Sequence, residues 1–222
     1  MKRFIVSALC LLVAVAASAQ YQPTTTWPYE YDDFVKGTIH MSVGNDKTEL
    51  VNINVINGTL HFIDGDFIKE VKPGEVFSVQ IGDDYYVNAG GRMMKILAKD
   101  DNGYVAESSE VDMVKLNSTG AAYGSSSATV GTMALSSLEG IGGSRANMNH
   151  MEIKSNRDSG QALPLIDRKY IVADSKVIYA TRKDVSERVD ASEFKEFLKS
   201  NKVKWNDPQS LLSVVDFVAR QK

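Results

Sequence analysis

Two Asn-Gly pairs, Asn57-Gly58 and Asn102-Gly103, each stand between short runs of β-branched and aromatic residues. An Asn-Gly pair is the strongest short signal for a β-hairpin, because both central residues of the tight turn need positive φ. Asp64-Gly65 and Pro73-Gly74 add turn signals, so strand-like runs recur about every ten residues between 37 and 117. This spacing predicts an antiparallel β-rich part, built as a meander, a sandwich or a small barrel.

Residues 151–222 change from strand signals to helix signals. They begin with strand-like runs at 162–166, 169–173 and 176–180. Beyond residue 190, apolar residues recur at the spacing of three to four that is typical of an amphipathic helix. We therefore expect an α+β fold that is mostly β, in which a smaller part of strands and two helices follows the β-rich part.

The starts of these helices carry capping signals. Asp184 before Glu187, and Asp190 before Glu193, have the spacing of a capping box, in which the first residue caps the helix. Asp207-Pro208 predicts that the last helix begins at the proline, because its missing N–H costs nothing in the first turn.

The first nineteen residues have the pattern of an export signal. Lys2 and Arg3 precede an apolar run at 4–15, and Ala17-Ser18-Ala19 supplies small residues for cleavage. The run is shorter than the roughly 20 apolar residues that span a bilayer, so we expect a cleaved signal peptide at 1–19 and no transmembrane segment in the mature chain. Cleavage would remove Cys10, the only cysteine, so the mature protein would depend on its core without disulfides.

The mature chain divides by composition into three parts. Residues 20–117 form the β-rich part with an aromatic N-terminal arm, and residues 151–222 form the smaller αβ part. Between them, residues 118–150 are rich in glycine and serine and carry few charges. This composition is typical of a connector.

The charge is acidic and unevenly placed. Without Lys2 and Arg3, 23 basic residues face 28 acidic ones, and residues 20–119 hold most of the excess. A surface for nucleic acid or anionic lipid would be basic, so we expect neither partner.

Three stretches resemble small secreted and envelope proteins of the Bacteroidales, a family with no assigned function. The first joins the signal to Trp27-Pro28-Tyr29-Glu30-Tyr31, and the second is the segment 81–87 followed by Met94-Lys95-Ile96-Leu97. The third runs from Phe197 through Trp205 to Phe217. The resemblance implies export, to the periplasm, the outer membrane or the outside of the cell, and it implies no catalytic residue.

Aromatic residues gather near the predicted mature N-terminus. On an exposed platform such rings anchor a protein partner or stack on sugar rings, whereas in a buried cluster they tie the arm to the core. The sequence leaves both interpretations open. The candidate binding residues are Trp27, Tyr29 and Tyr31, beside Phe34, with Tyr85 and Tyr86 as neighbours.

Acidic residues recur in pairs at predicted turns. If the hairpin ends met at one edge of the fold, their carboxylates would offer the oxygen ligands that calcium binds. Calcium is therefore the candidate cofactor that this pattern indicates. Aspartate also favours turns for purely local reasons. The candidate ligands are Asp64, Asp66, Asp83, Asp84, Asp100 and Asp101.

The histidines show no metal-binding spacing. His40 and His61 fall on predicted strands and could face each other, but a site would need a third ligand such as Asp64. Local hydrogen bonding of strand histidines is the simpler interpretation.

Export, clear strand signals and the lack of a catalytic motif favour a non-catalytic envelope module that binds a protein or a glycan. One alternative is a hydrolase or metal-dependent enzyme whose site assembles from dispersed Asp, Glu and His residues, since such sites are defined by geometry. A second alternative is a structural or adhesin-like subunit in which the Gly/Ser-rich segment exchanges between protomers.

Overall fold

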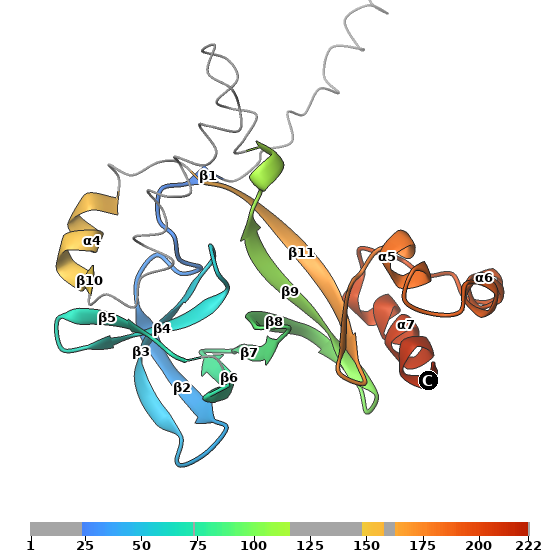
Figure 1. The fold of residues 1–222 in the computed structure, drawn as a ribbon, viewed down its shortest axis with the longest axis horizontal. Coiled ribbons are helices and arrows are strands. Elements are labelled where there is room, and N and C mark those ends of the chain that lie inside the picture. The colour runs from blue at the N-terminus through green and yellow to red at the C-terminus, as the bar shows by residue number, and fades with distance from the viewer. Residues whose placement is uncertain (1–23, 73, 116–147, 158–162, 222) are drawn as a thin grey trace, which may run out of the picture.

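The computed structural model describes residues 24–72, 74–115, 148–157 and 163–221 (Figure 1). The predicted signal peptide and nearly all of the predicted connector lie outside these residues. The described strands pair antiparallel throughout, in the order β1-β11-β9-β8-β7-β6-β2-β3-β4-β5-β10, with β12 beside β11. The fold is therefore α+β and mostly β, as the sequence predicts.

Two four-strand meanders make up the β-rich part. The first meander consists of β2 (Val35–Met41), β3 (Lys47–Asn54), β4 (Thr59–Asp64) and β5 (Phe67–Glu70). The second consists of β6 (Val76–Ile81), β7 (Asp84–Ala89), β8 (Arg92–Lys99) and β9 (Gly103–Val111). Pairing of β2 with β6 joins the two meanders into one sheet.

The C-terminal strands extend the same sheet. β11 (Leu163–Ala173) pairs with β9 along most of its length, with β12 (Lys176–Tyr179) at its end and with β1 (Thr24–Thr25) at its start. The runs at 162–166 and 169–173 are therefore one strand rather than two. The sheet continues across the division drawn from composition.

The sheet is open but curled, so that β4 and β8 approach each other. Met93 N–H donates to the Gly58 carbonyl at 2.7 Å, at the start of β8. The concave side of this curl holds a cluster that includes Val51, Val79 and Tyr86.

The predicted hairpins form, but their turns differ from the tight Asn-Gly type. Gly58 has a φ of 69°, whereas Asn57 keeps a negative φ within a longer loop. At the second hairpin, the Asp100 carboxylate accepts hydrogen bonds from the backbone N–H groups of Asn102 and Gly103, at 2.9 and 3.0 Å. An Asp side chain thus closes this turn, whereas the sequence predicts that the positive-φ preference of Asn-Gly forms it.

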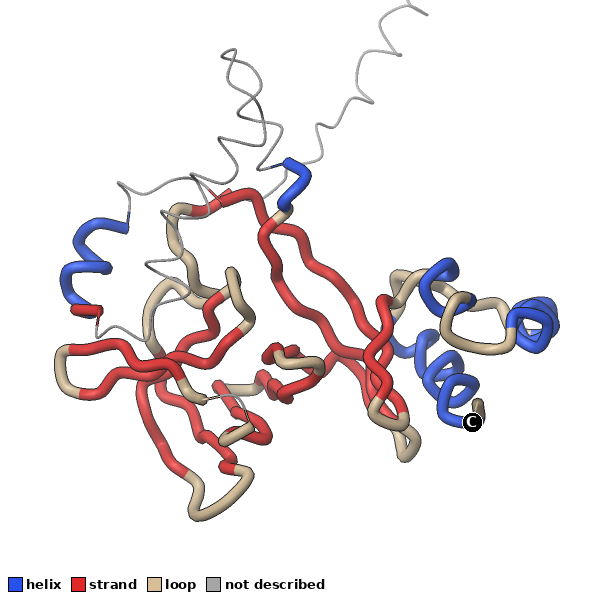
Figure 2. Tube along the Cα trace, viewed as in Figure 1, coloured by secondary structure: helices blue, strands red, loops and turns tan. Residues whose placement is uncertain are grey.

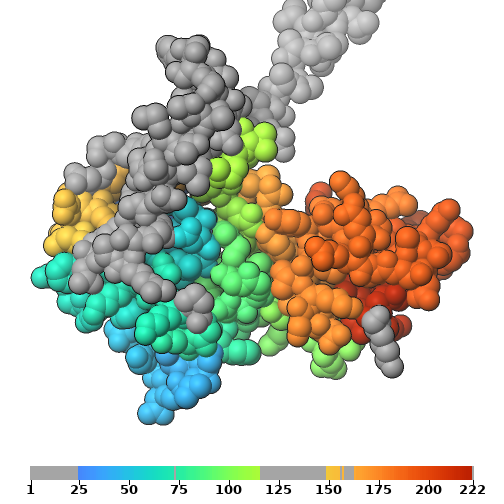
Figure 3. Space-filling view, in the orientation of Figure 1, coloured from blue at the N-terminus to red at the C-terminus, as the bar shows by residue number. Residues whose placement is uncertain are grey.

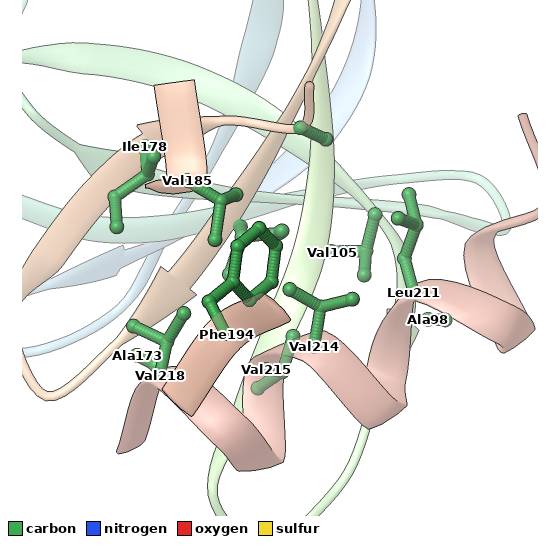
Figure 4. Packing of buried hydrophobic residues seen from close by; sticks show 12 residues of the cluster. Ala98, Val105, Ala173, Ile178, Val185, Phe194, Leu211, Val214, Val215 and Val218 are labelled. Atoms are coloured by element: carbon green, nitrogen blue, oxygen red, sulfur yellow. The ribbon is translucent and has the colours of Figure 1, made fainter. Parts of the chain in front are cut away.

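Three helices follow the last strand, and the last of them packs against β9 and β11 (Figures 1 and 2). They are α5 (Arg182–Ser186), α6 (Ala191–Ser200) and α7 (Pro208–Arg220). Leu211, Val214, Val215 and Val218 of α7 are completely buried and pack with Phe194 of α6 (Figure 4). In the space-filling view this C-terminal segment forms a lobe beside the strands (Figure 3).

Two of the three predicted helix N-caps are confirmed. Asp190 accepts from the N–H groups of Ser192 and Glu193, and Asp207 accepts from Gln209 N–H before the N-terminal proline of α7. The prediction for Asp184 is wrong, because Thr181 caps α5 and Asp184 lies inside the helix.

A short element that the sequence did not predict lies at the other end of the sheet. β10 (Met148–Asn149) pairs with the edge of β5, and α4 (His150–Asn156) follows it. Ile153 of α4 packs against the cluster of Trp27 and Phe34. Among the described residues, no helix is long and apolar enough to cross a membrane.

Candidate functional site

The aromatic arm forms part of the core. Trp27 and Tyr29 are 6% and 4% exposed, and they pack with Phe34 and Ile68. Tyr29 and Phe34 meet edge to face, with ring centroids 5.0 Å apart. Burial of such large rings fixes the arm to the sheet and withdraws Trp27 and Tyr29 from any partner.

His61 holds the arm through a buried polar chain. The Tyr29 hydroxyl lies 3.0 Å from Nδ1, while Nε2 lies 3.2 Å from Thr59 Oγ1 and 3.4 Å from a Glu70 carboxylate oxygen. Burial lowers the pKa of His61 more than the Glu70 carboxylate raises it. The ring is therefore neutral, with Tyr29 donating to Nδ1 and Nε2–H donating toward Thr59 and Glu70.

His40 takes no part in this chain. It lies on β2 beside the β2–β3 turn, where Nδ1 is 2.8 Å from Asp46, whereas His61 faces Asn52 near the other end of β3. The register of β2, β3 and β4 thus keeps the two histidines at opposite ends of the strands. The two-histidine metal site does not assemble.

The turn acids also remain apart. Asp64 pairs with Lys69, and Asp100 closes its own turn. In the described part of the chain, no three His, Asp or Glu side chains lie close enough to hold a metal ion. The calcium prediction therefore gains no support.

Tyr85 and Tyr86 lie on opposite faces of β7, as neighbours on a strand do. The Tyr85 hydroxyl meets Ser78 at 2.7 Å, and its ring lies beside His40 on the outer face. Tyr86 faces the concave side, where its hydroxyl lies 2.9 Å from the hydroxyl of Tyr31. The structure thus brings Tyr31 and Tyr86 together and separates Tyr85 from them.

Asn52 positions Tyr31 by binding its backbone. The Asn52 side chain is completely buried, accepts from Tyr31 N–H at 3.0 Å and donates to the Tyr31 carbonyl at 2.8 Å. It also donates to the Asp33 carbonyl at 3.0 Å. These three hydrogen bonds from one buried amide fix the arm, and with it the direction of the Tyr31 ring.

Asp84 and Lys95 complete the network around Tyr31. The Tyr31 hydroxyl donates to Asp84 Oδ2 at 3.0 Å, and Lys95 Nζ lies 2.6 Å from Asp84 Oδ1. Burial raises the pKa of Tyr31 to about 12. Burial alone would raise the pKa of Asp84, but Lys95 and Tyr31 outweigh it and hold that pKa below its ordinary value.

A row of polar residues crosses the sheet beside this network. Tyr86 faces Lys95, Lys95 faces Glu107, and Glu107 faces Lys169, on β7, β8, β9 and β11 in turn. The Lys169 ammonium lies 3.2 Å from Glu107. Two residues further along β9, on the same face, Ser109 Oγ donates to Asp167 at 2.8 Å.

Glu30 reaches this row from the arm. Its side chain is exposed at the surface, yet protein surrounds it on most sides, as in a concavity. Burial raises the pKa of Glu30, and Asp167 and Glu107 add to the rise, while the Ser109 hydroxyl and Lys95 oppose it.

A small hollow of about 20 Å³ lies under Glu30, between Tyr86, Lys95, Glu107 and Ser109. This volume holds one water molecule. We call the surrounding surface the Glu30 cleft. Its residues are Glu30, Tyr31, Asp84, Tyr86, Lys95, Glu107, Ser109 and Asp167.

Three residues of the Glu30 cleft, Tyr31, Asp84 and Tyr86, were candidates from sequence. Lys95, Glu107 and Ser109 were missed, although polar residues at alternate strand positions indicate a polar stripe on one face. The residues of a strand do not show which other strand pairs with it, so the partners of this stripe could not be predicted. Comparisons of the chain with protein-family models, curated proteins and solved structures give no match.

Proposed function

We propose that this protein is an exported, non-catalytic module of the cell envelope that binds a glycan in the Glu30 cleft. The observation that carries the proposal is a network of tyrosine hydroxyls, carboxylates and an ammonium group, Tyr31–Tyr86 and Tyr31–Asp84–Lys95, that adjoins the small hollow under Glu30. The export signal predicted at residues 1–19 supports the envelope setting, and so does the resemblance to secreted Bacteroidales proteins.

The chemistry of the cleft favours a neutral, hydroxyl-rich ligand. Glu30, Asp84, Glu107 and Asp167 outnumber the lysines, so an anionic ligand would be repelled. Sugar hydroxyls both donate and accept, and they match carboxylates, tyrosine hydroxyls and an ammonium equally well. Water in the hollow can bridge ligand and protein at little cost.

Binding of soluble envelope oligosaccharides, measured by calorimetry, tests the proposal. Tyr31→Phe removes the donor to Asp84 and should weaken binding about tenfold, the effect of one lost hydrogen bond to a charged group. Tyr85→Phe is the matched control, because Tyr85 lies on the opposite face, and it should bind as the wild type does. Equal affinities of all three proteins, or no binding to any neutral glycan, would refute the proposal.

A hydrolase is the second candidate, because Glu30 and Glu107 line the same hollow. Glycoside hydrolysis uses two carboxyl groups, one of which keeps its proton at neutral pH, and the raised pKa of Glu30 suits that role. Chromogenic glycosides test it directly. Turnover by the wild type that both Glu30→Gln and Glu107→Gln abolish would establish the enzyme, and no turnover on any glycoside would exclude a glycosidase.

A further inference from the structure

A second concave surface lies on the other face of the sheet. Along β9 and β11, Glu107 and Lys169 face the Glu30 cleft, so their neighbours Ala106 and Tyr170 face the opposite side. A groove of about 320 Å³ opens there between the start of β8, the β11–β12 hairpin and the end of α5. We call it the Tyr179 groove. Its lining includes Arg92, Met94, Tyr170, Tyr179, Asp184 and Arg188.

Two guanidinium groups line this groove without a carboxylate partner. Arg92 donates one long hydrogen bond, 3.4 Å, to the Val55 carbonyl, and its buried Nε has no partner among the described residues. Arg188 is exposed, and no ion pair in the described ranges involves it. The exposed Arg188 guanidinium is therefore a ready bidentate donor to a carboxylate, whereas Arg92, packed against Gly58, adds positive charge behind it.

Aromatic rings form one wall of the groove. The Tyr170 and Tyr179 centroids lie 4.8 Å apart, and the Arg168 guanidinium lies 5.4 Å from the Tyr179 centroid. Tyr170 is fixed by donating to Glu110, whereas Tyr179 is 40% exposed. A rigid wall with an exposed ring suits the apolar side of a sugar.

Asp184 is the one acid in the lining, and it accepts from the Thr181 hydroxyl. With Asp184 the lining carries a net charge of +1, which balances one carboxylate rather than the higher charge of phosphate, and the Asp184 carboxylate accepts readily from sugar hydroxyls. The combination therefore selects a ligand with one carboxylate and several hydroxyls.

We propose that the Tyr179 groove binds a uronic acid residue of an acidic glycan. The sugar carboxylate binds the exposed Arg188 guanidinium, with Arg92 adding positive charge, while the sugar ring packs against Tyr179 and a hydroxyl donates to Asp184. This site is independent of the Glu30 cleft, because it lies on the opposite face of the sheet and binds an acidic sugar rather than a neutral one.

Calorimetry with a trimer of galacturonic acid and with its methyl ester tests the proposal, since the two probes differ in charge. We expect the acid to bind at least tenfold more tightly than the ester, and its affinity to fall as salt is added. Arg188→Ala should weaken binding of the acid at least tenfold and remove the preference over the ester. Lys183→Ala is the matched control, because it removes the same charge from α5 at a side chain that is 82% exposed and outside the groove.

Three results would overturn the proposal. The first is equal binding of acid and ester by the wild type, or binding of neither. The second is an equal effect of Arg188→Ala and Lys183→Ala, which would show a general charge effect. The third is tighter binding of inorganic phosphate than of the trimer. The comparison of acid with ester needs no variant, so equal binding of the two probes refutes the proposal even if a substitution unfolds the protein.

Discussion

At the residue scale, buried polar side chains fix the arm that carries Tyr31. His61 is 3% exposed and neutral, and it connects Tyr29 of the arm to β4 and β5. Asn52 binds the backbone of the arm from β3. The aromatic arm was predicted from sequence, but its polar anchors were not, because an isolated Asn or His on a strand carries no mark of its partner.

The neutral His61 makes stability depend on pH. Its folded pKa lies below the ordinary 6.5, so the unfolded chain takes up the proton first and stability falls as pH drops below about 6.5. His61→Gln should cost about 1–3 kcal/mol at neutral pH, because buried partners lose their hydrogen bonds, and should remove part of this acid sensitivity. Urea unfolding of both proteins between pH 5 and pH 8, about the range in which histidine titrates, measures both effects. An unchanged pH profile in the variant would contradict the assignment.

Glu30 should make stability depend on pH in the opposite direction to His61. Its folded pKa is raised above the ordinary 4.5, so folding is favoured at low pH and weakened as pH rises through the folded pKa. Glu30→Gln mimics the protonated form, and it should raise the melting temperature at neutral pH but not at acidic pH. A stabilising substitution that also weakens glycan binding is the behaviour expected of a functional residue. A lower melting temperature of the variant at neutral pH would contradict the raised pKa.

At the element scale, local sequence signals predict where strands and helices lie better than they predict which strands pair. Turn residues mark β3, β4, β6, β7 and β8, and the Asp207-Pro208 start of α7 was correct to the residue. The β2–β6 and β9–β11 pairings could not be predicted, because they join strands that are distant in the chain. The Glu30 cleft depends on the second pairing, which places Asp167 opposite Ser109.

The buried stripe of α7 holds the C-terminal end of the sheet. Leu211 is completely buried, whereas its neighbour Leu212 is only partly buried. Leu211→Ala should therefore cost about 2–5 kcal/mol of unfolding free energy, the range for a cavity in a packed core. Leu212→Ala, the matched control, should cost clearly less in the same denaturant titration. Equal losses would show that α7 does not pack through this stripe.

At the scale of the whole molecule, one curled sheet carries two concave surfaces of different charge on its two faces. The Glu30 cleft is mainly acidic and suits neutral hydroxylated ligands, while the Tyr179 groove has unpaired guanidinium groups. Period-two alternation along β9 and β11 separates them. This layout underlies our two proposals, a separate glycan site on each face of the sheet.

The measurement that tests the central claim most directly is a backbone amide NMR titration of the protein with neutral envelope oligosaccharides. We predict that the largest shifts fall on Glu30, Tyr31, Tyr86, Lys95 and Glu107, and that Tyr31→Phe reduces them while Tyr85→Phe does not. Shifts confined to the Tyr179 groove, or spread without a centre over the surface, would contradict glycan binding in the Glu30 cleft.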